Sequence, residues 1–180
     1  MSVFSIDAHD GGSIEHALLS LDVQEKLVQI AAYRALNKTA RWLKTQTIRH
    51  ISGETGLTQK LIRKRMHMLH ANRRNLRAML TSRNQHIPAS ELGRMRESGK
   101  GARAGKFYFE GGFVGHMPST GKTSIYRRKQ KARLPIRELG FYYGGFTSRA
   151  WEDASKGDEV MQRFGRFFEH ELNFISRKHN

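Results

Sequence analysis

The stretch FYFEGGFVGHMPSTGKTSIYRRK, residues 107–129, decides the fold of this chain. Short aromatic and β-branched runs alternate in it with single or paired glycines, and a further run, Phe141-Tyr142-Tyr143, precedes Gly144-Gly145. Runs of this kind, bounded by turn residues, are typical of strands in an antiparallel sheet. We therefore expect a hairpin in which the turn 115–122 joins a strand within 107–114 to a strand within 125–129.

The same stretch contains Gly115 and then Gly121-Lys122-Thr123, which resembles the phosphate-binding loop of nucleotide hydrolases. That loop follows the pattern Gly-x-x-x-x-Gly-Lys-Ser/Thr, and here the gap between the glycines is one residue longer. Pro118 removes a backbone donor, and residues 124–128 indicate a strand where the motif requires a helix. We interpret the segment as a hairpin turn. A nucleotide-driven assembly enzyme that uses Lys122 is the alternative.

Helical periodicity dominates the N-terminal part of the chain. Apolar or small residues recur at helical spacing over residues 28–47, which predicts a long amphipathic helix over 23–51. Asp22, with Glu25 three residues later, has the pattern of an N-terminal cap. Residues 1–21 show weak periodicity and are expected to form an N-terminal arm.

A short helix is expected next over residues 59–67, with Thr58 as its cap. Residues 71–106 then carry many arginines and lysines against few acidic residues, with a strand-like alternation at 76–81 and a glycine-rich run at 98–106. A glycine-rich basic run cannot bury enough apolar surface to order itself. The segment 71–106 is therefore expected to be an extended basic arm between subunits or a mobile loop.

The last expected element is an apolar-striped helix over residues 156–177, which should cover the sheet. The expectations together describe an α+β fold. It has a long N-terminal helix, a short basic helix, an antiparallel β-sheet with an extended basic loop or arm, and a C-terminal helix packed on the sheet. Residues 22–180 are expected to form a single domain.

Positive charge is the main chemical signal. The chain has 32 Lys+Arg against 16 Asp+Glu, a formal net charge of +16. Such an excess repels itself in an isolated chain and attracts polyanions. A basic surface that serves solubility alone is the alternative. The candidate residues for facing DNA or a partner are Arg63, Lys64, Arg65, Arg73, Arg74, Arg127, Arg128, Lys129, Lys131 and Arg133.

No catalytic constellation is visible in the sequence. There is no cysteine and no nucleophile-elbow motif, and His67 and His70 lack a nearby carboxylate that would complete a metal site. An arm that is not preorganised is unsuited to catalysis, and this applies to the cluster Asp7, His9, Asp10 and His16. We expect no enzymatic activity, no cofactor and no metal. No apolar run reaches the roughly 18 residues that a membrane span requires.

The stretch RRKQKARLPIRELG, residues 127–140, resembles the minor tail protein Z family of long-tailed bacteriophages, both lambda-like and Mu-like. The matching positions are Arg127, Arg133, Leu134, Pro135, Ile136 and Leu139. The stretch AAYRALNKTARWLKTQTIRHISGETGLTQKLIRKRM, residues 31–66, is similar to the first two helices of that family. The resemblance extends over residues 23–178.

The Leu134-Pro135-Ile136 sequence also has a direct physical interpretation. Proline fixes its own φ and favours an extended conformation in the residue before it. Leu134 and Ile136 would then point to the same face of an edge strand and anchor the turn in the core. We expect Leu134, Pro135, Ile136 and Leu139 to have a structural role.

The resemblance implies a non-enzymatic virion protein at the head-proximal end of the tail, assembled in the host cytoplasm. It implies a tail completion or connector ring, a hexamer, that joins tail to head and surrounds or positions genomic double-stranded DNA. Its other partners would be the tail terminator, the tail tube and the head–tail connector. The alternative is a sequence-independent nucleic-acid-binding protein, such as a packaging or ribosome-associated factor.

Overall fold

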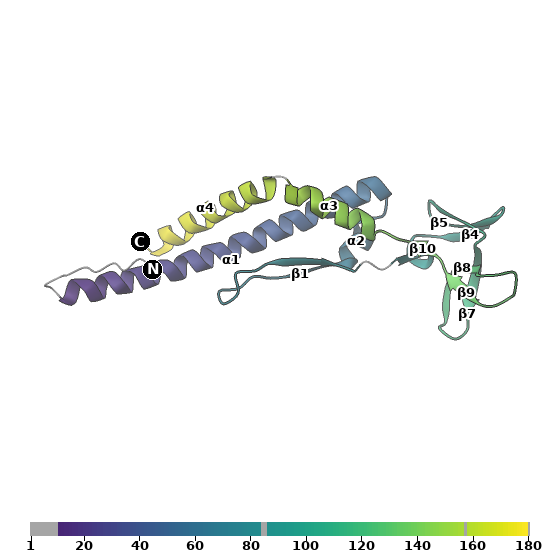
Figure 1. The fold of residues 1–180 in the computed structure, drawn as a ribbon, viewed down its shortest axis with the longest axis horizontal. Coiled ribbons are helices and arrows are strands. Elements are labelled where there is room, and N and C mark those ends of the chain that lie inside the picture. The colour runs from purple at the N-terminus through teal and green to yellow at the C-terminus, as the bar shows by residue number, and fades with distance from the viewer. Residues whose placement is uncertain (1–10, 84–85, 157, 180) are drawn as a thin grey trace. The chain divides into compact units, whose positions relative to one another are not determined.

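The computed structural model describes residues 11–83, 86–156 and 158–179. Helices and short strands build the chain (Figure 1), which confirms the expected α+β class. The helices are α1 (Gly11–Thr55), α2 (Gln59–Arg65), the 3-10 turn η1 (Ala89–Glu91), α3 (Gly144–Lys156) and α4 (Glu159–His179). The strands are β1 (Met66–Leu69), β2 (Met79–Ser82), β3 (Ile87–Pro88), β4 (Met95–Ser98), β5 (Gly101–Ala104), β6 (Phe107–Glu110), β7 (Phe113–Met117), β8 (Lys122–Arg128), β9 (Ile136–Glu138) and β10 (Gly140–Phe141).

The strands form small sheets, with the orders β4-β5-β6, β7-β8-β9, β1-β2 and β10-β3. The hairpin expected from residues 107–129 is confirmed as β7 and β8, which pair from Phe113 with Tyr126 to Met117 with Lys122. Gly121 ends the intervening turn with a φ of 60°, a backbone conformation that favours glycine. Lys122 begins a strand, so the helix that a phosphate-binding loop requires is absent here.

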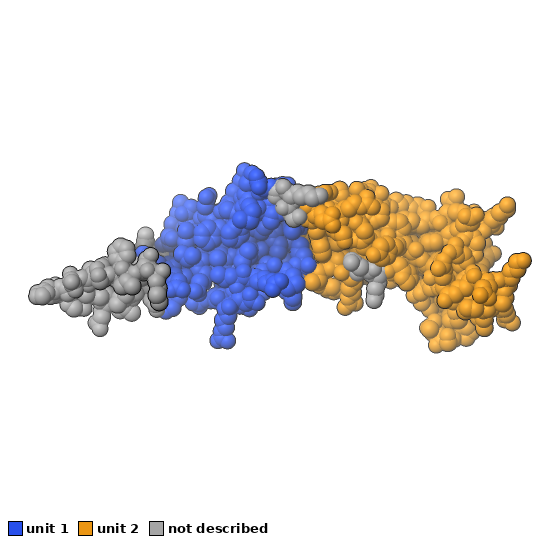
Figure 2. All heavy atoms as spheres, in the orientation of Figure 1, with its two compact units in different colours: residues 1–43, 68–80, 157–180 blue, residues 44–67, 81–156 orange. Residues whose placement is uncertain are grey.

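The described residues fall into two compact units, coloured separately in Figure 2. Of the described residues, unit 1 comprises 11–43, 68–80 and 158–179, and unit 2 comprises 44–67, 81–83 and 86–156. Helix α1 contributes its first part to unit 1 and its last turns to unit 2.

Helix α4 packs on α1 in unit 1 and runs beside it in Figure 1. Ala31 and Ala35 of α1 are fully buried, and such small side chains allow a second helix to approach closely. The guanidinium of Arg163 on α4 lies 4.9 Å from the ring centre of Trp42 on α1. The C-terminal helix was expected to cover the sheet. Its contacts are with α1 instead, through Trp42, Arg34 and Lys38.

An ion-pair cluster also joins these two helices. The carboxylate of Glu171 on α4 is buried and pairs with Lys38 and with Arg34, the latter at 3.5 Å, both on α1. Burial alone would raise the pKa of Glu171, but the two cations outweigh burial and hold that pKa below its ordinary value. The charged form of Glu171 therefore stabilises the helix pair.

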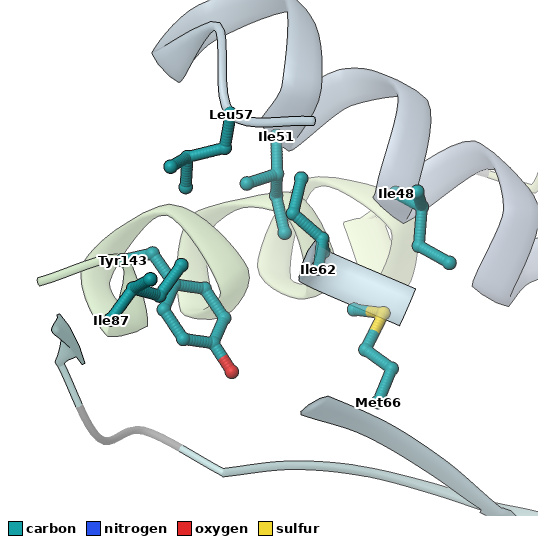
Figure 3. Packing of buried hydrophobic residues seen from close by; sticks show 7 residues of the cluster. All are labelled: Ile48, Ile51, Leu57, Ile62, Met66, Ile87 and Tyr143. Carbon is teal, nitrogen blue, oxygen red and sulfur yellow. The ribbon is translucent and has the colours of Figure 1, made fainter. Parts of the chain in front are cut away.

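The main core of unit 2 gathers side chains from helices and strands that are distant in sequence (Figure 3). The ring of Tyr143 is fully buried, and its hydroxyl donates a hydrogen bond to the backbone carbonyl of Arg83. The tyrosine thus satisfies its polar end while it fills the core. The buried members are Ile48, Ile51, Leu57, Ile62, Met66, Ile87 and Tyr143.

A second core in unit 2 corrects the expectation for residues 98–106. These residues were expected to be flexible, but β5 pairs with β4 on one side and with β6 on the other. Both neighbours satisfy the β5 backbone, and Ala102 and Ala104 are fully buried beside Ala89 and Ile125. The order comes from tertiary pairing, which the composition of the run does not reveal. An arm between subunits within 71–106 stays a prediction.

Two helix boundaries and one whole helix differ from expectation. Helix α1 begins at Gly11, so residues 11–21 are helical and Asp22 lies inside the helix, where it cannot be the N-cap. No glycine or proline interrupts residues 13–52, so nothing in the backbone stops the helix. Helix α3 was not expected, because Gly144-Gly145 indicated a turn. Helix α2 ends at Arg65 and places His67 on β1. Residues 1–10 of the expected arm lie outside the described residues.

Leu134 does not anchor the core, because its side chain is 67% exposed. The connection between β8 and β9 closes with a hydrogen bond of 3.0 Å from the Lys129 N–H to the Pro135 carbonyl. Leu134 belongs to this connection, and β9 begins only at Ile136. Ile136 is half-buried, and Leu139 packs against the second core, as expected.

We expect Leu57→Ala to lower the free energy of unfolding by about 2–5 kcal/mol, because it leaves a cavity in the main core of unit 2. Leu57 is 2% exposed. Leu134→Ala is the matched control and should change stability by no more than about 0.5 kcal/mol. Urea unfolding of the three proteins measures both values. A large loss in Leu134→Ala would restore this leucine as an anchor.

We expect Glu171→Gln to lower stability by about 1–2 kcal/mol at neutral pH, since it removes charge-assisted bonds to side chains that are partly solvent-screened. The lowered pKa of Glu171 means that its contribution is complete above its ordinary pKa and disappears as the pH falls through the lowered value. The stabilities of wild type and variant should therefore converge in acid. Unfolding curves recorded at a series of pH values test this, and a difference independent of pH would contradict it.

Candidate functional site

The first group of exposed cations lies on the connection between β8 and β9, which we term the hairpin cluster. Lys129, Lys131 and Arg133 are exposed there. The sequence contains no acidic residue between Glu110 and Glu138. The cluster therefore has no carboxylate of its own segment to neutralise it. It consists of Arg127, Arg128, Lys129, Lys131 and Arg133.

The two arginines at the end of β8 have different neighbours. The guanidinium of Arg128 lies 5.8 Å from the ring centre of Phe113, a cation–π distance that restrains the side chain without neutralising it. Arg127 lies opposite Arg137 of β9 in the strand register. The sequence analysis did not select Arg137. The sequence does place Arg127 and Arg137 on either side of a hairpin turn. That they face each other follows only once the strand register is known.

Lys122, at the start of β8, is engaged by Glu138 of β9. Lys122 Nζ lies 2.7 Å from Glu138 Oε1. Burial alone would raise the pKa of Glu138, but contacts with Lys122 and Ser124 and the proximity of His86 lower that pKa overall. The pair cross-links β8 and β9 at the end of the hairpin remote from the exposed cations.

The second group is the α2 cluster, Arg63, Lys64 and Arg65. Arg63 and Lys64 are exposed. Arg65 is only 14% exposed and donates a hydrogen bond of 2.9 Å to Glu91. It is therefore engaged by a carboxylate of its own chain, while its two neighbours remain accessible.

An open pocket in unit 2 brings the α2 cluster close to β9. Its volume is about 630 Å³, and Lys64 and Arg65 of α2 and Glu138 of β9 lie on its wall. Arg83, His86, Pro88 and Glu91 complete the lining. Cations outnumber carboxylates on this wall, so the pocket favours anionic groups.

The third group, Arg73 and Arg74, lies on a rigid turn in unit 1. The Asn37 side chain of α1 holds the start of the turn, because its Nδ2 donates to the Ala71 carbonyl at 2.9 Å and its Oδ1 accepts from the Ala71 N–H at 2.8 Å. Asn72 Oδ1 then accepts hydrogen bonds from the N–H groups of Arg74 and Asn75. The backbone is fixed while both arginine side chains are exposed.

The three groups share one chemistry. Exposed guanidinium and ammonium groups donate hydrogen bonds to phosphate or carboxylate oxygens, and guanidinium can do so with two donors at once. In the part of the chain that the structure describes, no three His, Cys, Asp or Glu side chains gather as a metal site would require. No described helix is long and apolar enough to cross a membrane.

The chain is similar to phage tail proteins. The family model described as prophage minor tail protein Z (GPZ) matches residues 13–141. A tail completion protein of Escherichia phage N15 is 28% identical over 135 residues, which make up 68% of this chain and 73% of that protein. No solved structure matches the chain.

We expect Asn37→Ala to lower the free energy of unfolding by about 1–3 kcal/mol, because it leaves the buried N–H and carbonyl of Ala71 without partners. Amide hydrogen exchange at Ala71 should accelerate at the same time. Asn173→Ala, on an exposed position of α4, is the matched control and should change neither quantity appreciably. Unchanged exchange in Asn37→Ala would show that the turn does not depend on this side chain.

Proposed function

The chain belongs to the prophage minor tail protein Z family, and from this premise we propose that it acts in tail completion as one subunit of a closed ring. The ring lies at the head-proximal end of the tail, joins the tail to the head, and surrounds or positions the end of the genomic DNA. Membership in this family makes the chain a structural protein of the phage tail.

The observation that supports the DNA role is the hairpin cluster. Five cations follow one another there within residues 127–133, and the nearest acidic residue on the hairpin, Glu138, is already paired with Lys122. Charge without an internal partner attracts an external polyanion, and contacts to backbone phosphates need no particular base sequence. A ring repeats the cluster around its axis and so gathers many weak contacts on one DNA duplex.

A ring is also a common way for identical subunits to assemble. Head-to-tail contacts between identical subunits generate rings when the rotation closes. The proposed assembly is a hexamer, and its neighbours are the tail terminator, the tail tube and the head–tail connector. Assembly takes place in the host cytoplasm. The protein needs no catalytic step for this role.

A sequence-independent nucleic-acid-binding protein that acts as a free monomer is the second candidate, since the same cationic surfaces support it. The two candidates differ in oligomeric state. A free binder is a monomer with high affinity for duplex DNA. A ring component self-associates, and its affinity for DNA is low until the hairpin cluster is multiplied by assembly.

We expect the purified full-length chain to form a closed oligomer whose affinity for a mixed-sequence duplex rises with the oligomeric fraction. Native mass spectrometry and fluorescence anisotropy, recorded over the same range of protein concentrations, measure the two quantities. A monomer that binds the duplex tightly at every concentration would favour the free binder and overturn the ring.

The triple variant Lys129→Gln, Lys131→Gln, Arg133→Gln should reduce the infectivity of particles that carry it while the thermal stability of the protein stays unchanged, because all three side chains are exposed. Arg49→Gln, Arg177→Gln, Lys178→Gln is the matched control, with three exposed cations removed from the helices. Plaque assays on complemented phage compare the two. An equal loss in both triple variants would show that net charge, and not the hairpin cluster, carries the effect.

A further inference from the structure

Two arginines face each other across the β8–β9 hairpin. The register pairs Arg127 with Arg137, between the pairs Tyr126 with Glu138 and Arg128 with Ile136. Side chains that are directly opposite in an antiparallel pair lie on the same face, with Cβ atoms about 4.5–5.5 Å apart. Like charges in this arrangement repel each other, so the hairpin contains an unfavourable contact that its own sequence does not relieve.

Among the residues that the structure describes, no carboxylate neutralises this arginine pair. Glu138 is adjacent to Arg137 along β9, but successive side chains of a strand point to opposite faces, and Glu138 is paired with Lys122. Within the described residues, neither Arg127 nor Arg137 forms an ion pair with an acidic side chain.

The turn between β6 and β7 packs against the stem of Arg127. The aliphatic stem of Arg127 passes Gly111, and its Cδ lies 3.5 Å from the point that a Cβ of that residue would occupy. Arg127 is half-buried and its stem is packed, whereas Arg137 is exposed to solvent.

We propose that Arg127 and Arg137 together bind a single phosphate of the DNA backbone, an inference that rests on the proposed function and assigns a specific contact to it. The phosphate oxygens accept hydrogen bonds from both guanidinium groups, and its negative charge converts the repulsion between the arginines into a bridged arrangement. The exposed Lys129, Lys131 and Arg133 continue the cationic surface toward neighbouring phosphates.

A phosphodiester backbone fits this hairpin better than an acidic protein surface does. Protein interfaces have an apolar or aromatic centre that is surrounded by polar groups, but the connection 129–135 offers a single large exposed apolar side chain, Leu134. The rest of the segment is a succession of cations with spacers, which is the pattern expected for sequence-independent contacts to phosphates.

The strand pair β4–β5 supplies a comparison within the same unit. Arg96 lies opposite Arg103 in its register, which resembles the arrangement of Arg127 and Arg137. The guanidinium of Arg103, however, lies 5.4 Å from the ring centre of Tyr108, and the face of an aromatic ring attracts a cation. Arg103 therefore has a stabilising neighbour within the chain, and Arg103→Gln is the matched control.

The test measures binding of a mixed-sequence duplex to the full-length protein by fluorescence anisotropy over a series of salt concentrations. Arg137→Gln should weaken binding roughly tenfold at low salt, and Arg103→Gln by no more than about twofold. The double variant Arg127→Gln, Arg137→Gln should lower the salt slope by about 0.9 for each subunit bound to the duplex, the value for one phosphate, because both arginines hold the same group. A decrease near 1.8 for each bound subunit would indicate two separate phosphates and overturn the shared contact.

Thermal unfolding without DNA separates a ligand-binding role from a structural one. Arg137→Glu replaces the repulsion with an opposite-charge pair, so its melting temperature should equal or exceed that of wild type while duplex binding is lost. A lower melting temperature would make Arg137 a structural residue and overturn the proposal.

The remaining outcomes distinguish this inference from the proposed function. If wild type binds the duplex and Arg137→Gln binds equally well, the phosphate contact is wrong and the ring is unaffected. If Arg137→Gln binds DNA normally but fails in tail assembly, the phosphate contact is also wrong, because the arginines then contact an acidic protein. If assembled wild type does not bind the duplex at all, both the contact and the DNA role of the ring are wrong.

Discussion

Carboxylates are scarce in this chain, and the structure depends on where they are used. Each of the well-formed ion pairs joins two elements: Glu171 holds α4 to α1, Glu138 links β9 to β8, and Glu91 restrains Arg65 of α2. Their partners are cations that the fold requires in fixed positions. Within the described residues, the cations of the hairpin cluster form no ion pair with a carboxylate, and Lys129, Lys131 and Arg133 lie on a connection where an external anion can reach them. These three pairs thus set Lys38, Lys122 and Arg65 apart from the hairpin cluster, which has no acidic residue in its own segment.

The small cores support this separation by fixing the backbone beneath the exposed charges. In unit 2, alanines on β5 and Ile125 on β8 bring adjacent sheets into contact, and the aromatic and aliphatic core around Tyr143 holds α2 and β3. In unit 1, the amide of Asn37 fixes the turn that carries Arg73 and Arg74. Rigid backbone lowers the entropy that a flexible cationic loop would lose on binding. The cations are therefore presented by ordered turns, although the sequence around them is rich in glycine and polar residues.

Local patterns in the sequence predicted the elements that depend on local interactions. The β7–β8 hairpin follows from aromatic runs around a Pro/Gly turn, and α1 follows from the spacing of its alanines. Some errors involve long-range contacts, and others, such as Asp22 as an N-cap, concern where a helix begins. Gly99 and Gly101 suggested a flexible arm because the pairing of β5 with two neighbours is not visible in composition, and Gly144-Gly145 concealed the start of α3. The partner of α4 could not be derived either, since its apolar stripe fits a helix as well as a sheet.

The residues of the candidate site also divide into those that local sequence reveals and those that only the structure reveals. Most exposed cations were found from the sequence, because a run of basic residues without acids is a local feature. Arg137 was missed, since its significance arises from its position opposite Arg127, and that register depends on where the β8–β9 connection closes. Leu134 was assigned to the core because proline favours an extended neighbour, yet the closing hydrogen bond of Lys129 leaves it outside β9.

Cryo-electron microscopy of intact particles, focused on the junction between head and tail, tests the central claim most directly. The account predicts that this chain forms a closed ring there, with the β8–β9 hairpins directed inward and Arg127 and Arg137 beside the density of the DNA. A channel lined at that level by arginines of another protein, with these hairpins buried in protein contacts or absent from the junction, would contradict it.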